Sequence, residues 1–452
     1  MRDLYTQPEG HAQAPPSNFG GRVRQLGPSL IVSASIVGSG EIILTSSLGA
    51  AVGFGMLWWI LLSCWSKSIV QAELARYVVV TGDTYILMLN RLPGKLTGPK
   101  GPVSWTLVLG LLAFIPGLTG LGGLMGGAAQ AMVLFVPTIS ALAVTAVLAC
   151  IIAAVLATGQ YRNLERTLIP LVFVFTLTTL LCFWMLQNSS QAITFEQTLA
   201  GLTFDFDVSF AVLALAVYGY TGVNSAEISA YSYWCIEKGY PGKIGPPSDD
   251  PAYYARARGW LKVLRLDIRL TLVLLTLATV PFYYLGAGIL HPLGTVPAGT
   301  ETIRVLSQMF TATIGESAFL LFATGAFCIL FSSAVAGVAA GARYIPDYLM
   351  ELGFLDRSRL DIRRRIIKGY GLAIPFVGLA FYAGFQQPVL MVTIAACFGA
   401  LMLPVQSGMT LYLSQRHIPK PLRATRPAWL LLQATFLFQL VMAALVIYFV
   451  VL

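Results

Sequence analysis

Three ionisable residues lie deep inside apolar stretches of this 452-residue chain: Glu41, Lys67 and Glu227. A charged side chain near the middle of a membrane costs about 2.5–3.5 kcal/mol even on a lenient insertion scale. Such residues are kept mainly where they bind an ion or solute, move protons, or neutralise one another. We therefore expect Glu41 and Glu227 to take part in binding or coupling. Lys67 is expected to serve coupling or charge compensation.

Both acids follow a cluster of glycine and small polar residues. Residues 36–42 read IVGSGEI and residues 218–228 read YGYTGVNSAEI, so both end in Ser-(Gly/Ala)-Glu-Ile. Glycine weakens a helix by about 1 kcal/mol relative to alanine. Unwound backbone at membrane depth survives only where it lines a cavity or is buried in protein. We predict two interrupted helices that meet at a binding site. For the glycines at 117–127 and for Gly337 and Gly341, close helix packing is the preferred interpretation.

The composition places these residues in a membrane protein. Hydrophobic residues make up 56% of the chain and charged residues 11%, whereas soluble domains carry about 25% charged residues. This excludes a single water-soluble core and a disordered chain. The net charge of +9 is carried by loops beside apolar stretches, a pattern typical of membrane topology rather than of a nucleic-acid-binding face.

Eleven stretches are long and apolar enough to cross a bilayer. Their limits are 28–48, 55–79, 104–133, 138–157, 167–186, 209–235, 268–290, 316–345, 369–384, 388–413 and 428–451. Nearly all Lys and Arg fall in alternate loops, which predicts a cytoplasmic N-terminus and an extracellular C-terminus. We expect an integral protein of a bacterial-type plasma membrane. Residues 252–267 alternate aromatic and basic side chains, and we expect a short helix lying on anionic headgroups.

The spans divide into two candidate repeats of five helices. An odd number of crossings places the two repeats in opposite orientations, and matching interruptions in inverted repeats indicate a transporter binding site. We expect an all-α polytopic protein with discontinuous first and sixth spans. The expected parts are a cytoplasmic tail (1–27), the first repeat (28–186), an outer loop (187–208), the second repeat (209–414), and a cytoplasmic loop with the eleventh helix (415–452).

Several classes of function lack the residues they need. The three histidines, His11, His291 and His417, fall outside the apolar spans, so the membrane interior holds no histidine metal site and no Ser-His-Asp arrangement. The six cysteines lie in or beside apolar segments and are expected to be reduced. No glycine-rich nucleotide loop is present. We expect neither an enzyme nor a pump, with no cofactor, and an interrupted-helix pair favours a carrier over a channel.

The chain resembles the NRAMP family of metal-ion transporters, which share the LeuT-type fold. The resemblance runs through most of the chain and rests on the order and spacing of several segments. These segments are Leu61-Leu62-Ser63, Gln71 through Arg76 to Thr81-Gly82, Tyr161-Arg162-Asn163-Leu164-Glu165, Asp267, and Gly325 through Ser332-Ser333 to Ala336-Gly337.

The chain departs from the family pattern where the metal would bind. The family's Asp-Pro-Gly-Asn aligns with residues 38–41, so Gly38 replaces the aspartate and Glu41 the asparagine. Its Met-Pro-His aligns with residues 223–225, and the alanine whose carbonyl binds metal aligns with Tyr220. The acidic residue in helix three and the basic residue in helix nine have no equivalents. The resemblance, together with the deep acids, leads us to expect these substrate-binding residues: Gly38, Ser39, Glu41, Tyr220, Val223, Asn224 and Glu227.

The remaining ligands would be carboxylate, hydroxyl, amide and carbonyl oxygens. Such a set suits a hard divalent cation such as Mg²⁺ better than Mn²⁺ or Fe²⁺. We expect an alternating-access carrier of a divalent metal cation, with Glu41 and Glu227 as metal ligands and the lipid bilayer as its environment. The alternative is a carrier of a small organic solute, such as an amino acid or organic anion, which Lys67 would favour by repelling a cation. Proton or cation coupling fits either cargo.

Overall fold

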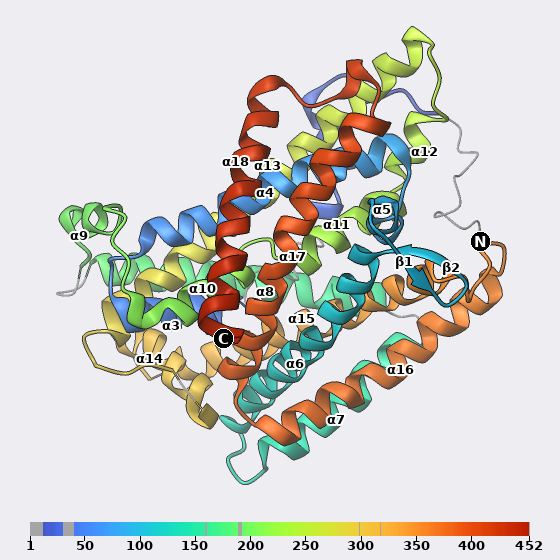
Figure 1. Cartoon of the computed structure of the whole chain (residues 1–452). Coiled ribbons are helices and arrows are strands. Elements are labelled where there is room, and N and C mark those ends of the chain that lie inside the picture. The colour runs from blue at the N-terminus through green and yellow to red at the C-terminus, as the bar shows by residue number, and fades with distance from the viewer. Residues whose placement is uncertain are drawn as a thin grey trace.

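The computed structural model describes residues 12–29, 40–158, 161–188, 192–297, 299–316 and 318–451. Almost all regular structure in these ranges is helical, as Figure 1 shows. The helices before the sixth span are α1 Phe19–Gln25, η1 Gly40–Thr45, α3 Ser46–Val52, α4 Leu57–Thr81, α5 Tyr85–Arg91, α6 Trp105–Val133, α7 Ala141–Thr158, α8 Tyr161–Gln187 and α9 Phe195–Ala200.

The second half of the chain is also mostly helical. Its elements are η2 Val208–Phe210, α10 Ala211–Tyr220, α11 Ser225–Glu237, α12 Tyr240–Ile244, α13 Pro251–Leu285, η3 Gly286–Leu290, η4 Gly299–Glu301, α14 Thr302–Ile314, α15 Ala318–Glu351, α16 Leu360–Phe385, α17 Pro388–His417, η5 Lys420–Leu422, α18 Arg426–Val446 and η6 Ile447–Val451. The prediction of an all-α membrane protein is confirmed.

Seven helices within the described ranges are long and apolar enough to cross a membrane, and three shorter apolar helices accompany them. Their positions follow the predicted spans, although several extend further. Helix α16 begins at Leu360, nine residues before the predicted ninth span, and α15 continues to Glu351. Both extensions carry charged residues. A hydropathy criterion ends a predicted span at such residues, whereas the helix itself can continue through them. The count of eleven crossings remains a prediction.

Residues 252–267 are helical, as expected, but they form the first part of the long helix α13 rather than a separate short helix. Trp260 and Tyr253 are 2% and 1% exposed, so the aromatic side of this part of α13 is buried in protein, whereas Arg258, Lys262 and Arg265 are exposed. The Trp260 indole donates a hydrogen bond to the carbonyl of Gln13, and Pro15 lies against Gly259. The N-terminal segment therefore covers the aromatic side of this part of α13, and contact of the exposed basic side chains with anionic headgroups remains a prediction.

A β-hairpin was not predicted. Strands β1 (Lys95–Gly98) and β2 (Gly101–Ser104) pair antiparallel, with Lys95 opposite Ser104. Helices α9 and α14 between the spans were not predicted either, because they are short or amphipathic and carry no long apolar stretch. Each lies outside the elements that form the site.

Close packing of long helices builds the core. Helix α6 packs against α15, α16 and α17, and α7 runs beside α16 along one edge of the molecule (Figure 1). The predicted packing role is confirmed for Gly126 and Gly341, because a side chain at either position would collide with Tyr382 or Tyr370. It is wrong for Gly117 and Gly337, which have no such neighbour within 4 Å and line a cavity.

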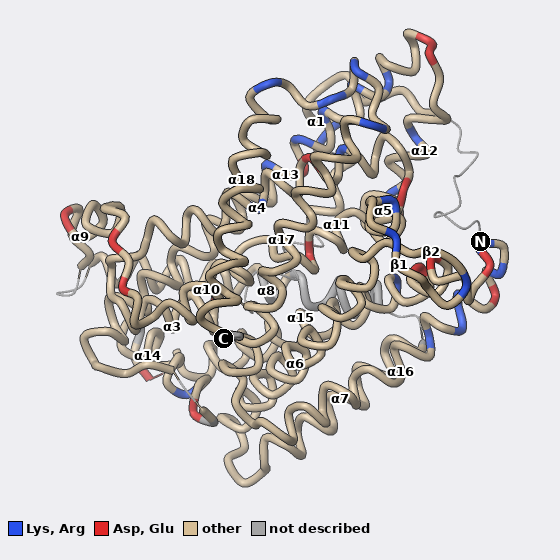
Figure 2. Tube along the Cα trace, viewed as in Figure 1, with Lys and Arg blue, Asp and Glu red and all other residues tan. Residues whose placement is uncertain are grey.

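Charged residues are strongly segregated. Figure 2 shows many of the lysines and arginines around α1, α12 and the start of α13, with others beside β1, β2 and α16. The stretch of α7 and the lower part of α6 show no charged residues in that view. This distribution agrees with the loop pattern from which the topology was predicted.

Candidate functional site

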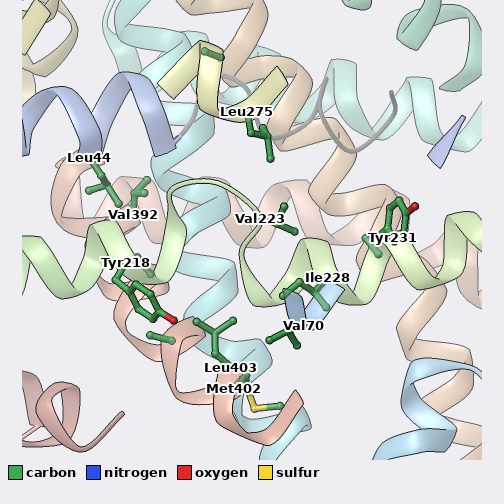
Figure 3. Packing of buried hydrophobic residues seen from close by; sticks show 14 of the residues in the cluster. Leu44, Val70, Tyr218, Val223, Ile228, Tyr231, Leu275, Val392, Met402 and Leu403 are labelled. Carbon is green, nitrogen blue, oxygen red and sulfur yellow. The ribbon is translucent and has the colours of Figure 1, made fainter. Parts of the chain in front are cut away.

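The sixth span is interrupted, as predicted. Helix α10 ends at Tyr220 and α11 begins at Ser225. Thr221 has an extended backbone (φ −66°, ψ 138°), and Gly222 has φ +72°, a conformation that residues with a Cβ rarely adopt. Figure 3 shows the ribbon leaving its helical path between Tyr218 and Ile228, with Val223 in the non-helical stretch.

A capping box starts the second half-helix. The Asn224 side chain accepts a hydrogen bond from the Glu227 amide at 3.0 Å, and the Glu227 carboxylate accepts one from the Asn224 amide at 3.0 Å. Free amides and the helix dipole make this end electropositive, which favours an acid here. Glu227 is thus held at the break by its own helix start.

The interruption predicted in the first span lies mostly outside the described residues. Gly38 and Ser39 fall outside them, whereas Gly40–Thr45 forms a π-helical turn. Gly40 touches the sixth-span break, because a Cβ there would lie 2.9 Å from the Tyr220 ring. Thr45 and Thr221 share a hydrogen bond of 2.8 Å between their hydroxyls. The described segment that follows the predicted first-span interruption, Gly40–Thr45, therefore contacts the break in the sixth span.

Glu41 is completely buried and bonds to the sixth-span break. Its Oε1 accepts hydrogen bonds from the Gly222 amide at 3.3 Å and from the Thr279 hydroxyl of α13 at 3.1 Å. Thr279 was not predicted as a site residue, because a threonine inside an apolar span looks like any helix threonine that bonds its own backbone. Glu41 joins the first, sixth and seventh spans.

Lys67 of α4 is also completely buried, and its partners are backbone carbonyls. Its Nζ donates to the carbonyls of Tyr218 and Thr221, each at 2.5 Å, and lies 5.2 Å from the centre of the Tyr218 ring. Glu41 and Glu227 both interact electrostatically with this ammonium. The three deep ionisable residues predicted from the sequence are therefore gathered around one break.

A cavity of about 220 Å³ reaches the break. Of the predicted residues, Tyr220, Asn224 and Glu227 line it. Glu41 and Lys67 are fully buried, and Val223 is packed in the core at 0% exposure (Figure 3). The lining residues leading away from the break include Trp234, Tyr344 and Tyr370. These lie on the halves of α11, α15 and α16 that lead to the basic loops.

The cavity wall is largely apolar and aromatic. Aromatic rings of Phe114, Trp234, Tyr344 and Tyr370 line it, and Glu227 supplies the carboxylate among the described lining residues. Sequence inspection missed these aromatics, because a lone ring in an apolar span does not differ visibly from a core residue. The described ranges contain no group of three or more His, Cys, Asp and Glu residues that could hold a metal.

A second cavity of about 340 Å³ lies where α4, α5, α15 and α16 converge. Its charged residues pair with one another: Arg91 with Asp83 at 2.8 Å, Arg363 with Asp347 at 2.9 Å, and Arg357 with Glu351 at 2.6 Å. Such mutual pairing fastens the helix ends together. It makes this cavity a weaker candidate than the one at the break.

The long apolar helices and the interrupted sixth span, which Gly40–Thr45 contacts, have the architecture of membrane transporters built from discontinuous helices. Residues 29–452 match the family model described as natural resistance-associated macrophage protein-like (Nramp). The chain belongs to this family, whose members are transporters rather than enzymes, and this confirms the predicted family and the non-enzyme assignment. No curated protein sequence matches the chain.

Solved structures support the fold at low sequence identity. A mutant of the manganese transporter of Eremococcus coleocola is similar with a TM-score of 0.69 and 15% identity, over 99% of this chain and 90% of that one. The same transporter with a bound aromatic bis-isothiourea compound is similar with a TM-score of 0.68 and 15% identity, over 98% of this chain and 92% of that one. Mhp1, a nucleobase-cation-symport-1 transporter, is similar with a TM-score of 0.55 and 12% identity, over 98% of this chain and 93% of that one.

Proposed function

We propose that this protein is a secondary transporter that carries a hard divalent cation by alternating access through the break between α10 and α11. The observation that carries the proposal is the position of Glu227, an acid held at a half-helix start and lining a cavity. Family membership and the manganese transport of the Eremococcus coleocola relative support a metal ion as cargo.

The chemistry of the break favours a cation that keeps part of its water shell. Glu227 already accepts one hydrogen bond, and Asn224 and Ser225 beside it offer only oxygen and amide groups. By the alignment expected from the sequence, Gly38 and Val223 stand where the family has its aspartate and methionine ligands. Hard ions such as Mg²⁺ prefer oxygen ligands and dehydrate reluctantly. Lys67 offsets one of the two acidic charges nearby, which also argues against a bare divalent ion.

The basic loops set the orientation that we propose. If they face the cytoplasm, the N-terminus is cytoplasmic, the C-terminus is outside, and the cavity opens inward. Residues 28–186 and 209–414 would then be the inverted repeats that move against each other. Glu41 and Glu227 are the candidates for proton coupling, because they are the acids at the break.

A second candidate cargo is a small organic solute. The aromatic wall formed by Phe114, Trp234, Tyr344 and Tyr370 favours it, since pockets for organic molecules are mostly apolar with a few placed polar groups. A hydrated metal ion gains little from such a wall. Cation–π attraction would add to the binding of an organic amine.

Uptake by proteoliposomes separates these candidates. Mg²⁺, Mn²⁺, Ca²⁺ and a panel of amino acids are offered to the wild type, to Glu227→Gln, and to Glu196→Gln as a control in the exposed helix α9. We expect Mg²⁺ uptake that Glu227→Gln abolishes and Glu196→Gln retains. Uptake of an amino acid with silence for every metal would replace the cation by the organic cargo. Equal Mg²⁺ uptake by both variants would remove Glu227 from the site.

A further inference from the structure

The break in the sixth span leaves backbone groups that a continuous helix would satisfy. In an unbroken helix, the Tyr218 carbonyl would accept from the amide of residue 222, and the Thr221 carbonyl from that of residue 225. Instead, the Gly222 amide turns to Glu41, and both carbonyls turn to the Lys67 ammonium. A side chain from another span therefore satisfies the end of α10.

The surroundings of the Lys67 ammonium have the chemistry of a cation site. Two carbonyl oxygens lie 2.5 Å from Nζ, the Tyr218 ring lies beside it, and the acids Glu41 and Glu227 act on it from η1 and α11. Unwound carbonyls at the negative end of a half-helix are the groups that coordinate monovalent cations in interrupted-helix carriers. Here a covalently attached ammonium fills that position.

Other roles for Lys67 explain these contacts less well. A simple ion pair would bring Nζ within bonding distance of a carboxylate, whereas its two hydrogen bonds go to carbonyls of a different helix. A packing role needs no charge, and a buried ammonium is costly unless its protons are bonded. The two bonded carbonyls lie at the end of α10, and the negative end of a helix attracts a cation.

We propose that Lys67 is a built-in cation that replaces a dissociable inorganic ion at the sixth-span break. Its ammonium holds the end of α10 open and positions the Thr221–Gly222 turn beside Glu227. Lys67 is thus a positioning residue, and this role is independent of which cargo the protein carries. Removing its side chain leaves an empty site that a small monovalent cation can occupy.

Thermal unfolding of the purified full chain in detergent tests this proposal. The melting temperature is measured in choline, sodium, potassium and n-propylammonium chloride at one ionic strength. Lys67→Ala removes the part of the side chain that n-propylammonium replaces, and Lys368→Ala, at an exposed position of α16, is the control. We expect Lys67→Ala to melt lower than wild type in choline. Propylammonium should raise its melting temperature saturably by about 4 °C, with no rise in wild type or control.

Two results would overturn the proposal. One is a Lys67→Ala protein that is as stable as wild type, or that responds to no cation differently from the control. The other is a saturable rise of the wild-type melting temperature with sodium or potassium, which would show that an inorganic ion still binds at the break. If Lys67→Ala cannot be recovered folded, the wild-type comparison decides: equal melting temperatures in choline, sodium and potassium uphold the built-in cation.

Discussion

Glu41 and Lys67 hold opposite ends of a single peptide group. The carbonyl of the peptide that joins Thr221 to Gly222 accepts from the Lys67 ammonium, and the amide of the same peptide donates to the Glu41 carboxylate. Each charge faces the end of the peptide dipole that it attracts. Two spans thereby fix the orientation of the turn that interrupts a third.

This arrangement predicts energetic coupling between Glu41 and Lys67. Glu41→Gln or Lys67→Met alone should lower the free energy of unfolding by about 1.5–3 kcal/mol, because each leaves the other buried charge less well compensated. The double variant should lose at least about 1 kcal/mol less than the sum of the single losses. Chemical unfolding in detergent measures the free energy of unfolding of the wild type, the two single variants and the double variant. Additive losses would show that the two side chains act independently.

Gly222 should tolerate no side chain. Gly222→Ala places a Cβ at φ +72° and 3.0 Å from the Cys64 backbone, so it should lower stability by about 1–2 kcal/mol. Gly337→Ala in the helix α15 meets no such neighbour within 4 Å and should raise stability slightly, since alanine favours helix. Melting temperatures of the two variants test this. Equal melting temperatures would mean that the turn is not constrained as described.

Variants of Glu227 and Asn224 should affect different properties, cation binding in the first case and stability of the helix start in the second. Glu227→Gln keeps an oxygen that can accept from the Asn224 amide, so the fold should persist while cation uptake is lost. Asn224→Ala removes the cap and should cost about 1 kcal/mol of stability. Calorimetric binding and melting curves are compared for both. A Glu227→Gln protein that binds Mg²⁺ like wild type would contradict the role given to this carboxylate.

Asp267 should hold the start of the first span in place. Its carboxylate accepts from the Ser29 amide at 2.8 Å, the Ser29 hydroxyl at 2.6 Å, the Gly27 amide at 3.2 Å and the Tyr231 hydroxyl at 2.7 Å. Asp267→Asn replaces charged bonds by weaker neutral ones and loses one acceptor. Hydrogen exchange of the Gly27 and Ser29 amides should therefore speed up at least about tenfold.

The control for this prediction is Asp249→Asn, in the exposed loop before α13. This variant should leave the exchange rates of the Gly27 and Ser29 amides unchanged. If the amides of Gly27 and Ser29 exchange equally fast in wild type and in Asp267→Asn, the anchoring role is excluded.

The sequence was sufficient to predict the sixth-span interruption and to single out Glu41, Lys67 and Glu227, because glycine clusters and deep charges are rare in apolar spans. It could not show that Lys67 bonds to carbonyls rather than to a glutamate, since that depends on how α4 packs against α10. Residues 252–267 were predicted as a separate short helix but begin α13, because the sequence could not show that the N-terminal segment packs against their aromatic side chains. The cavity beside Gly117 and Gly337 could not be predicted, because glycines in an apolar span form the same pattern whether they pack against a helix or line a cavity.

The central claim, that the cavity at the sixth-span break serves a carrier, is tested most directly by two-sided labelling of Ala226→Cys. Ala226 lines the cavity next to Glu227 and is exposed. In a Cys150→Ser background, reconstituted protein is treated with a membrane-impermeant thiol reagent from either side. Alternating access predicts labelling from both sides, with cargo changing the ratio of the two rates. Labelling from one side alone, with and without cargo, would contradict it.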